Sequence, residues 1–188
     1  MAGIGYWRLA TDFLDLVEAA CGELVENANA WVVIGDESTI EKYRELTKWS
    51  DHRIAVPVLF NFLHGVELIL KGFISLQGNV PRHHELTRLL ADFNTACPDT
   101  RLGALIADYT GGLNPASPLG CFFATNGISV DDWYIALKYP ESAAGRPHDH
   151  VDLKYGATRT LSFWKALGQA AAEIRVAAVE LARDLGHV

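Results

Sequence analysis

Four polar residues recur at helical spacing in the middle of this 188-residue chain: Asn61, His64, Glu67 and Lys71. Residues three or four apart lie on the same face of an α-helix, so these side chains share one stripe. Glu67 precedes Lys71 by four residues, which is the favourable orientation for an ion pair within a helix. The stripe belongs either to an ordinary amphipathic helix with a solvated polar face or to a helix that lines a binding groove.

Basic and imidazole side chains follow shortly after this helix. Arg82, His83 and His84 precede a leucine-rich segment that is expected to be helical. Exposed amide groups at the start of a helix attract anions, so Arg82 could complete a phosphate-binding corner near Lys71. The alternative is that His84 caps the new helix or packs between helices.

A second polar cluster contains His148, Asp149, His150 and Asp152. Imidazole and carboxylate groups bind zinc and similar ions, and alternate residues of an extended segment share one side. No fourth ligand is indicated, so a solvated loop is the simpler interpretation and no metal is predicted. Arg146 precedes His150 here, and these residue types can hold a phosphate and transfer a proton.

Aromatic side chains surround one lysine further along the chain. Trp133, Tyr134 and Tyr139 lie close in sequence to Lys138. Aromatic rings interleaved with positive charge can stack nucleobases and hold phosphates. The alternative is that these rings close one end of a helical core.

The composition sets limits on the function. Hydrophobic residues make up 49% and charged residues 21%, and the formal net charge is −7. Such an acidic chain is not built for broad electrostatic capture of nucleic acid, although a local basic patch is compatible with it. The three cysteines are far apart in sequence and predict neither a disulfide framework nor a zinc site, which favours the cytoplasm.

Cofactor and membrane signals are weak in this sequence. It contains neither a P-loop nor a dinucleotide-binding glycine pattern, so no cofactor is predicted. The most apolar stretch, residues 54–63, is short, and the run after it is interrupted by polar residues. A membrane span needs about 20 predominantly apolar residues, so no membrane association is predicted.

The elements that must position these residues are predicted to be helices, because apolar residues recur at spacings of three and four. The expected helices cover about residues 4–33, 38–49, 52–77, 83–93, 98–109, 129–137 and 164–185. Ser38 with Glu41 forms a capping-box pattern, and Asp51 is placed to cap the following helix. Segments 111–127 and 140–156 are expected to be loops. The long helices near both ends suit antiparallel packing in a single all-α domain over residues 1–188.

The helix with the polar stripe and the segment after it carry a combined pattern. An E-L-x-x-K core is followed by a glycine turn and then by a His-Glu-Leu sequence that opens the next helix. The matching residues are Glu67, Leu68, Lys71, Gly78, His84, Glu85, Leu86 and Leu90. Residues 138–140 read Lys-Tyr-Pro after a further helix. Together these features resemble the HEPN family of helical bundles, in which an Arg-Tyr-Pro or similar tripeptide is common at that place.

The resemblance implies an antiparallel up-and-down bundle of four to five main helices with extra short helices. It also implies a homodimer with a polar groove near the dimer axis. Many family members cut RNA with an arginine and a histidine that are separated by four to six residues. Only three residues separate Arg146 from His150, so the ribonuclease motif is missing from this chain.

We therefore expect a non-catalytic HEPN-like binding module for a nucleotide, RNA or a partner protein such as a nucleotidyltransferase-like protein. The expected setting is a toxin–antitoxin or defence system. The groove residues would be Glu67, Lys71, Arg82, His84, Lys138 and Tyr139. One alternative is a divergent, metal-independent HEPN ribonuclease that acts as a toxin. Its acid–base histidine would be His150 or His84, assisted by Arg146 or Arg82. Another is a structural helical subunit that oligomerises, so whether the chain is an enzyme stays open.

Overall fold

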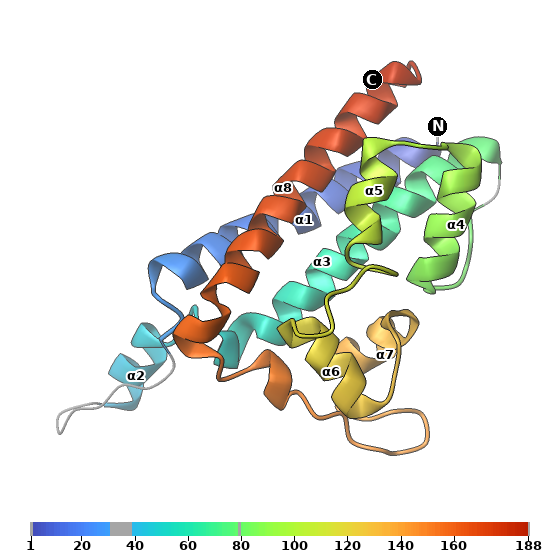
Figure 1. The fold of residues 1–188 in the computed structure, drawn as a ribbon. Helices are drawn as coiled ribbons and strands as arrows, with labels where there is room; N and C mark the ends of the chain where they lie inside the picture. The colour runs from blue at the N-terminus through green and yellow to red at the C-terminus, as the bar shows by residue number, and fades with distance from the viewer. Residues whose placement is uncertain (1, 31–38, 79, 188) are drawn as a thin grey trace.

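Three long helices form the centre of the molecule in the computed structural model, which describes residues 2–30, 39–78 and 80–187 (Figure 1). They are α1 (Ala2–Glu26), α3 (Asp51–Ile74) and α8 (Leu161–Asp184). Helix α1 packs against both of the others and runs antiparallel to them. No β-strand occurs among the described residues, which confirms the predicted all-α fold class.

Shorter helices and 3-10 turns surround the three long helices. They are α2 (Ile40–Leu46), η1 (Ser75–Gln77), α4 (Leu86–Ala96), α5 (Arg101–Ala107), α6 (Pro118–Asn126), η2 (Val130–Asp132), α7 (Trp133–Lys138), η3 (Val151–Leu153) and η4 (Ala157–Thr160). Helices α4 and α5 lie beside the C-terminal half of α3, and α6 and α7 lie beside its N-terminal half (Figure 1). Helix α2 projects from the bundle and buries none of its residues.

The apolar stripe predicted along the first helix faces the core. Ala10, Leu14, Val17, Cys21 and Leu24 are each at most 2% exposed. Large side chains from the other elements fill the space opposite this stripe, and they include Phe62, Phe73, Phe93, Trp133 and Trp164. Burial of each large apolar side chain contributes about 1.5–3 kcal/mol relative to exposure. This periodic burial is what makes these segments stable as packed helices.

Helix α1 approaches α3 closely because glycines face it. A Cβ atom added at Gly65 would lie 2.9 Å from Leu14 Cγ, and one at Gly72 would lie 2.3 Å from Trp7 Nε1. The Trp7 ring occupies the space beside Gly72 and packs on Phe73 at a centroid distance of 4.7 Å. The contact between the two helices therefore depends on the missing side chains at these positions.

The first helix is shorter than predicted. Helix α1 ends at Glu26, and Ala28 and Asn29 adopt left-handed backbone angles with φ of 52° and 51°. The helical pattern of apolar residues continues past this point. The chain nevertheless leaves the helix there, because the Asn29 side chain is hydrogen-bonded to Asp51. The predictions made for residues 31–38, including the helix end near Val33 and the cap at Ser38, lie outside the described residues.

Thr39 caps α2 by accepting a hydrogen bond from the Lys42 amide. Two other predicted helix starts need correction. Ser50 occupies the N-cap position of α3, so Asp51 is the first helical residue and its carboxylate is used for other contacts. Helix α4 begins at Leu86 and not near residue 83.

The segment 111–127 was predicted to be a loop, and this was wrong for its second half. Pro118 occupies the first turn of α6, and the Ser117 hydroxyl accepts a hydrogen bond from the Gly120 amide. Gly127 ends the helix in the left-handed region, with φ of 62°. Serine, proline and glycine therefore mark the ends of a short helix here. The other predicted loop, 140–156, contains the single turn η3 and an isolated bridge between Glu141 and Pro147.

The helix over residues 51–77 is long and apolar enough to cross a membrane by length and composition. Within the described residues, 67% of the most apolar 18-residue stretch of this helix is buried inside the protein. Core helices of soluble proteins meet the same criteria, so the predicted lack of membrane association stays a prediction.

The close contact between α1 and α3 gives a stability prediction. Gly72→Ala should lower the free energy of unfolding by about 1–3 kcal/mol, because the added methyl group meets the Trp7 ring. Gly22→Ala, on the exposed side of α1, is the matched control, since a Cβ atom added there would meet nothing within 4 Å. It should raise stability by about 0.5–1 kcal/mol. Urea unfolding followed by circular dichroism measures both, and equal effects would contradict the packing argument.

Candidate functional site

A buried carboxylate lies at the centre of the polar stripe on α3. Glu67 is 1% exposed, and its Oε1 atom accepts hydrogen bonds from Lys71 Nζ at 2.6 Å and from His84 Nδ1 at 2.8 Å. Its Oε2 atom lies 3.1 Å from His64 Nδ1. We call these four residues the Glu67 cluster. Three partners thus satisfy one carboxylate that has no access to water.

The protonation of Glu67 is set by two opposing effects. Burial disfavours the charged form and by itself would raise the pKa of Glu67. Hydrogen bonds from His64 and Lys71, together with the positive charge of Lys71 and His84, outweigh burial and lower this pKa. Glu67 is therefore a fixed negative charge that orients two imidazole rings and one ammonium group.

The Glu67 cluster continues to the protein surface through His84. The His84 ring stacks on Tyr134 with a centroid distance of 4.0 Å and an interplanar angle of 12°. Lys138 Nζ donates a hydrogen bond to the Tyr134 hydroxyl at 2.9 Å and lies 5.3 Å from the Tyr139 ring centroid. We call His84, Tyr134, Lys138 and Tyr139 the aromatic–basic surface. The side chain of His84 is 40% exposed and Tyr139 is 46% exposed, so two of these rings face solvent.

The structure brings together most of the predicted groove residues. Glu67, Lys71 and His84 are in direct contact, and Tyr134 links His84 to Lys138. Tyr134 was noted in the sequence only as part of an aromatic cluster, and its role as the link comes from its place on α7. The alternative that the stripe is the solvated polar face of an amphipathic helix was wrong for Glu67 and Lys71, which are 1% and 6% exposed.

Arg82 does not lie in a helix N-terminal corner. It is exposed, and α4 begins only at Leu86. His84 does not cap that helix either, because its Nδ1 atom is bound to Glu67 and its carbonyl accepts a hydrogen bond from Trp133 Nε1 at 2.9 Å. The predicted phosphate-binding corner at the start of α4 is therefore not formed by this geometry.

The segment that contains Arg146 and His150 performs a packing role. His150 Nε2 lies 2.9 Å from the Ala136 carbonyl, and its ring stacks on Phe122 at 5.2 Å. Arg146 is exposed at a turn, and no described contact joins its side chain to His150. Among the described residues, no group of three or more His, Cys, Asp or Glu side chains is arranged to hold a metal ion.

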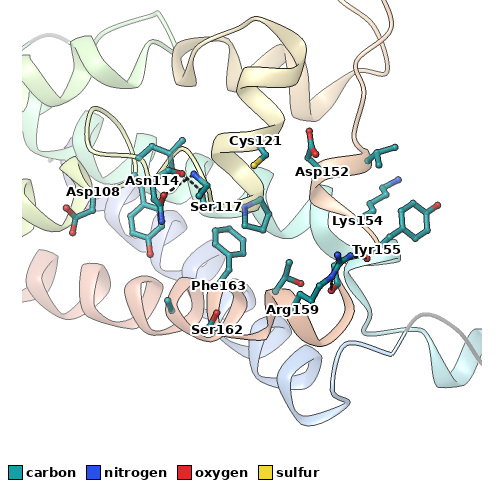
Figure 2. Close-up of a pocket in the computed structure, with 18 of the residues that line it drawn as sticks. Asp108, Asn114, Ser117, Cys121, Asp152, Lys154, Tyr155, Arg159, Ser162 and Phe163 are labelled. Atoms are coloured by element: carbon teal, nitrogen blue, oxygen red, sulfur yellow. Dashed lines mark hydrogen bonds between the residues drawn. The ribbon is translucent and has the colours of Figure 1, made fainter.

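A second candidate site lies on the other side of α6. It is an open cleft of about 840 Å³ between α6, the end of α5 and the segment that leads into α8, and we call it the α6–α8 cleft (Figure 2). Lys154 and Arg159 are its basic residues, and Phe163 lies in its centre. The sequence analysis did not predict these residues. Lys154 lies in the predicted loop 140–156, and Arg159 and Phe163 lie between that loop and the predicted last helix.

A buried carboxylate holds one wall of the α6–α8 cleft. Asp51 is 0% exposed and accepts hydrogen bonds from the amides of Tyr155 and Gly156 at 3.1 and 2.9 Å. The Asn29 side chain donates to the same carboxylate at 2.7 Å, and the Thr160 hydroxyl lies 3.3 Å away. These contacts tie the end of α1, the start of α3 and the cleft wall together, and we call them the Asp51 latch.

Comparisons with known proteins add no assignment: no family model, no curated protein and no solved structure matches this chain.

The Glu67 cluster predicts a pH-dependent stability. Because the pKa of Glu67 is lowered in the folded protein, its charge stabilises the fold above the ordinary value of 4.5. This contribution is lost as the pH falls through the folded-state pKa. Glu67→Gln should lower the free energy of unfolding by about 3 kcal/mol at neutral pH, since Lys71 is left buried without its counter-charge. Urea unfolding from pH 7 to pH 3 should show this difference shrinking on acidification, and a constant difference would contradict it.

The Asp51 latch predicts a local effect on the cleft wall. Asp51→Asn leaves one carbonyl oxygen for two backbone amides and should lower the free energy of unfolding by about 1–3 kcal/mol. Amide hydrogen exchange at Tyr155 and Gly156 should accelerate more than exchange elsewhere in the protein. Asp12→Asn on the exposed face of α1 is the control and should leave both measurements unchanged. Uniform acceleration along the chain would show that Asp51 supports the whole fold and not this wall.

Proposed function

We propose that the protein is a non-catalytic, HEPN-like binding module that takes a nucleotide or short single-stranded RNA at the aromatic–basic surface. The observation that carries the proposal is the stacked pair of His84 and Tyr134, with Lys138 Nζ 4.6 Å from the Tyr134 ring centroid. Parallel rings beside a positive charge offer one face for a base and one group for a phosphate.

The buried Glu67 supports this proposal by holding the surface in place. Its carboxylate fixes the His84 ring, and the His84 ring sets the plane of Tyr134. A ring held in this way loses little freedom when a base stacks on it, so less binding energy is spent on ordering. Tyr139 extends the aromatic area on the other side of Lys138.

Charge restricts the kind of nucleic acid that suits this surface. The formal net charge of −7 opposes accumulation of a long polyanion over the whole molecule. Positive charge is local, with Lys138 in this surface and the exposed Arg82 two residues before His84 in the sequence. A ligand of one or a few nucleotides uses base stacking and few phosphate contacts, which is compatible with an acidic protein.

The proposal assigns no cleavage to this surface, because Arg146 and His150 are not brought together there. His64 and His84 both point a ring nitrogen at Glu67, and His150 is bound to a backbone carbonyl. Arg146 lies at an exposed turn and makes no described contact with these rings. The homodimer, the cytoplasmic location and the toxin–antitoxin or defence setting are proposals that rest on the sequence and on the HEPN resemblance.

Binding of a labelled short single-stranded RNA, followed by fluorescence anisotropy, tests this proposal, with ATP as a competitor. Tyr134→Ala should weaken RNA binding roughly 5- to 150-fold, which corresponds to the loss of one stacked base. Tyr134→Phe should retain most of the affinity, because it keeps the ring and removes only the hydroxyl bound to Lys138. Lys138→Gln should weaken binding and reduce its dependence on salt.

Lys165→Gln on α8 is the control for charge, since Lys165 is exposed and lies outside this surface. It should leave the affinity unchanged, and the RNA should remain intact during incubation. Equal affinity of wild type and Tyr134→Ala, with both proteins folded by circular dichroism, would exclude the aromatic–basic surface as the binding site. Cleavage of the RNA that Tyr134→Ala does not alter would instead favour the ribonuclease alternative.

A further inference from the structure

The α6–α8 cleft separates two kinds of polar group across an apolar middle. Lys154 and Arg159 stand at one end, Phe163 lies in the centre, and Asp108 lies at the opposite end (Figure 2). We propose that this cleft binds a small phosphate monoester that carries a planar ring, of the size of a nucleoside monophosphate. This site is separate from the aromatic–basic surface and does not depend on it.

The basic end has unused donors for an anion. Neither Lys154 nor Arg159 forms an ion pair with another described residue. The guanidinium of Arg159 donates only to two backbone carbonyls, each at 3.4 Å, and a guanidinium has five N–H groups. Asp152 lies at the same end, but one of its carboxylate oxygens accepts a hydrogen bond from the Thr125 hydroxyl. The buried Asp51 behind this wall is a second carboxylate, so the two cations are balanced in formal charge. Their unused N–H donors are what favour a phosphate.

The wall that carries these cations is built in a strained conformation. Tyr155 and Ala157 have left-handed φ values of 61° and 48°, although neither is glycine. Such a conformation costs about 1–2 kcal/mol per residue, and here the Asp51 latch stabilises it. Strained backbone held in place by a buried group is common at binding sites, because it fixes side chains before the ligand arrives.

The middle and the far end suit the remainder of such a ligand. Phe163 is fixed by an edge contact with Trp164 at 5.0 Å and offers a flat apolar surface in the centre of the cleft. At the far end, burial raises the pKa of Tyr109 to about 12, so its hydroxyl remains a hydrogen-bond donor at neutral pH. The Asp108 carboxylate beside it is an acceptor. These groups match the hydroxyl or amino groups of a ring or sugar.

The size of the cleft limits the ligand further. Its volume of about 840 Å³ lies within the usual range for small-molecule sites, roughly 300–1,000 Å³. A single phosphorylated ring compound fits within such a space. The open side of the cleft allows entry without movement of a helix.

Cys121 lines the cleft and supplies a native reporter of occupancy. Burial raises the pKa of Cys21 to about 12 and also raises the pKa of Cys97, so both thiols react slowly. The rate of iodoacetamide modification at Cys121, measured by peptide mass spectrometry, is therefore the readout. The probes are the four common ribonucleoside monophosphates and phenyl phosphate, with adenosine and inorganic phosphate as partial ligands. Isothermal titration calorimetry with the same compounds measures binding without the thiol.

At least one of the ring phosphates should protect Cys121 about tenfold when its concentration is ten times its Kd, as mass action requires. Adenosine and inorganic phosphate should bind far more weakly, because adenosine lacks the phosphate and inorganic phosphate lacks the ring. Arg159→Gln and Lys154→Gln should each weaken binding roughly 10- to 150-fold, the usual loss for a hydrogen bond to a charged group. Lys42→Gln on the projecting helix α2 is the matched control and should bind normally.

Two results would overturn the proposal. One is that none of the five ring phosphates binds by calorimetry or slows the modification of Cys121. The other is that binding occurs but is unchanged in both Arg159→Gln and Lys154→Gln, with both variants folded, since the ligand would then lie elsewhere. A separate test of position is that Tyr134→Ala, on the aromatic–basic surface, should not alter protection of Cys121.

Discussion

Helix α3 buries two carboxylates, and each must be met by hydrogen-bond donors from other parts of the chain. Asp51, in its first turn, is met by the Asn29 side chain and by two amides of the segment before α8. Glu67, near its middle, is met by Lys71 on the same helix and by His84 from the connection to α4. An unpaired buried charge would be strongly unfavourable, so these requirements decide where the connecting segments run. The apolar stripes bring the long helices together, and the two carboxylates set how the irregular segments lie upon them.

The helical fold could be predicted from the sequence because its signal is local and periodic. The stripe from Ala10 to Leu24 and the boundaries of α3 and α8 follow from spacing and from glycine at helix ends. The end of α1 could not be predicted, because the apolar pattern continues there while Asn29 is held by Asp51, which is 22 residues away. Helix α6 was missed because serine, proline and glycine indicate a loop when counted together, although each also marks a helix end.

The two candidate sites differ in how much of each could be predicted, and the reason is physical. Three members of the Glu67 cluster, His64, Glu67 and Lys71, lie on the same helix, so their spacing already indicates it. His84 joins them from outside the helix. In the sequence it was connected to Lys71 by the predicted phosphate-binding corner and by the HEPN resemblance. The α6–α8 cleft has no such local signal. Its basic residues are positioned by hydrogen bonds to Asp51 that span 104 and 105 residues, and left-handed backbone angles at Tyr155 and Ala157 complete the wall.

Each of three histidines in this chain holds a neighbouring group in place through one ring nitrogen. The second ring nitrogen of each is not used by these contacts. His84 and His64 each direct a nitrogen to Glu67, and His150 directs one to the Ala136 carbonyl while its ring packs on Phe122. Asn126 binds both the amide and the carbonyl of Asp149, so the segment that carries His150 joins α6 to α7. These imidazoles position backbone and aromatic rings, and the groups left exposed to a ligand are stacked rings, an ammonium and a guanidinium. Such groups can stack on bases and pair with phosphates, and the proposed binding functions depend on them.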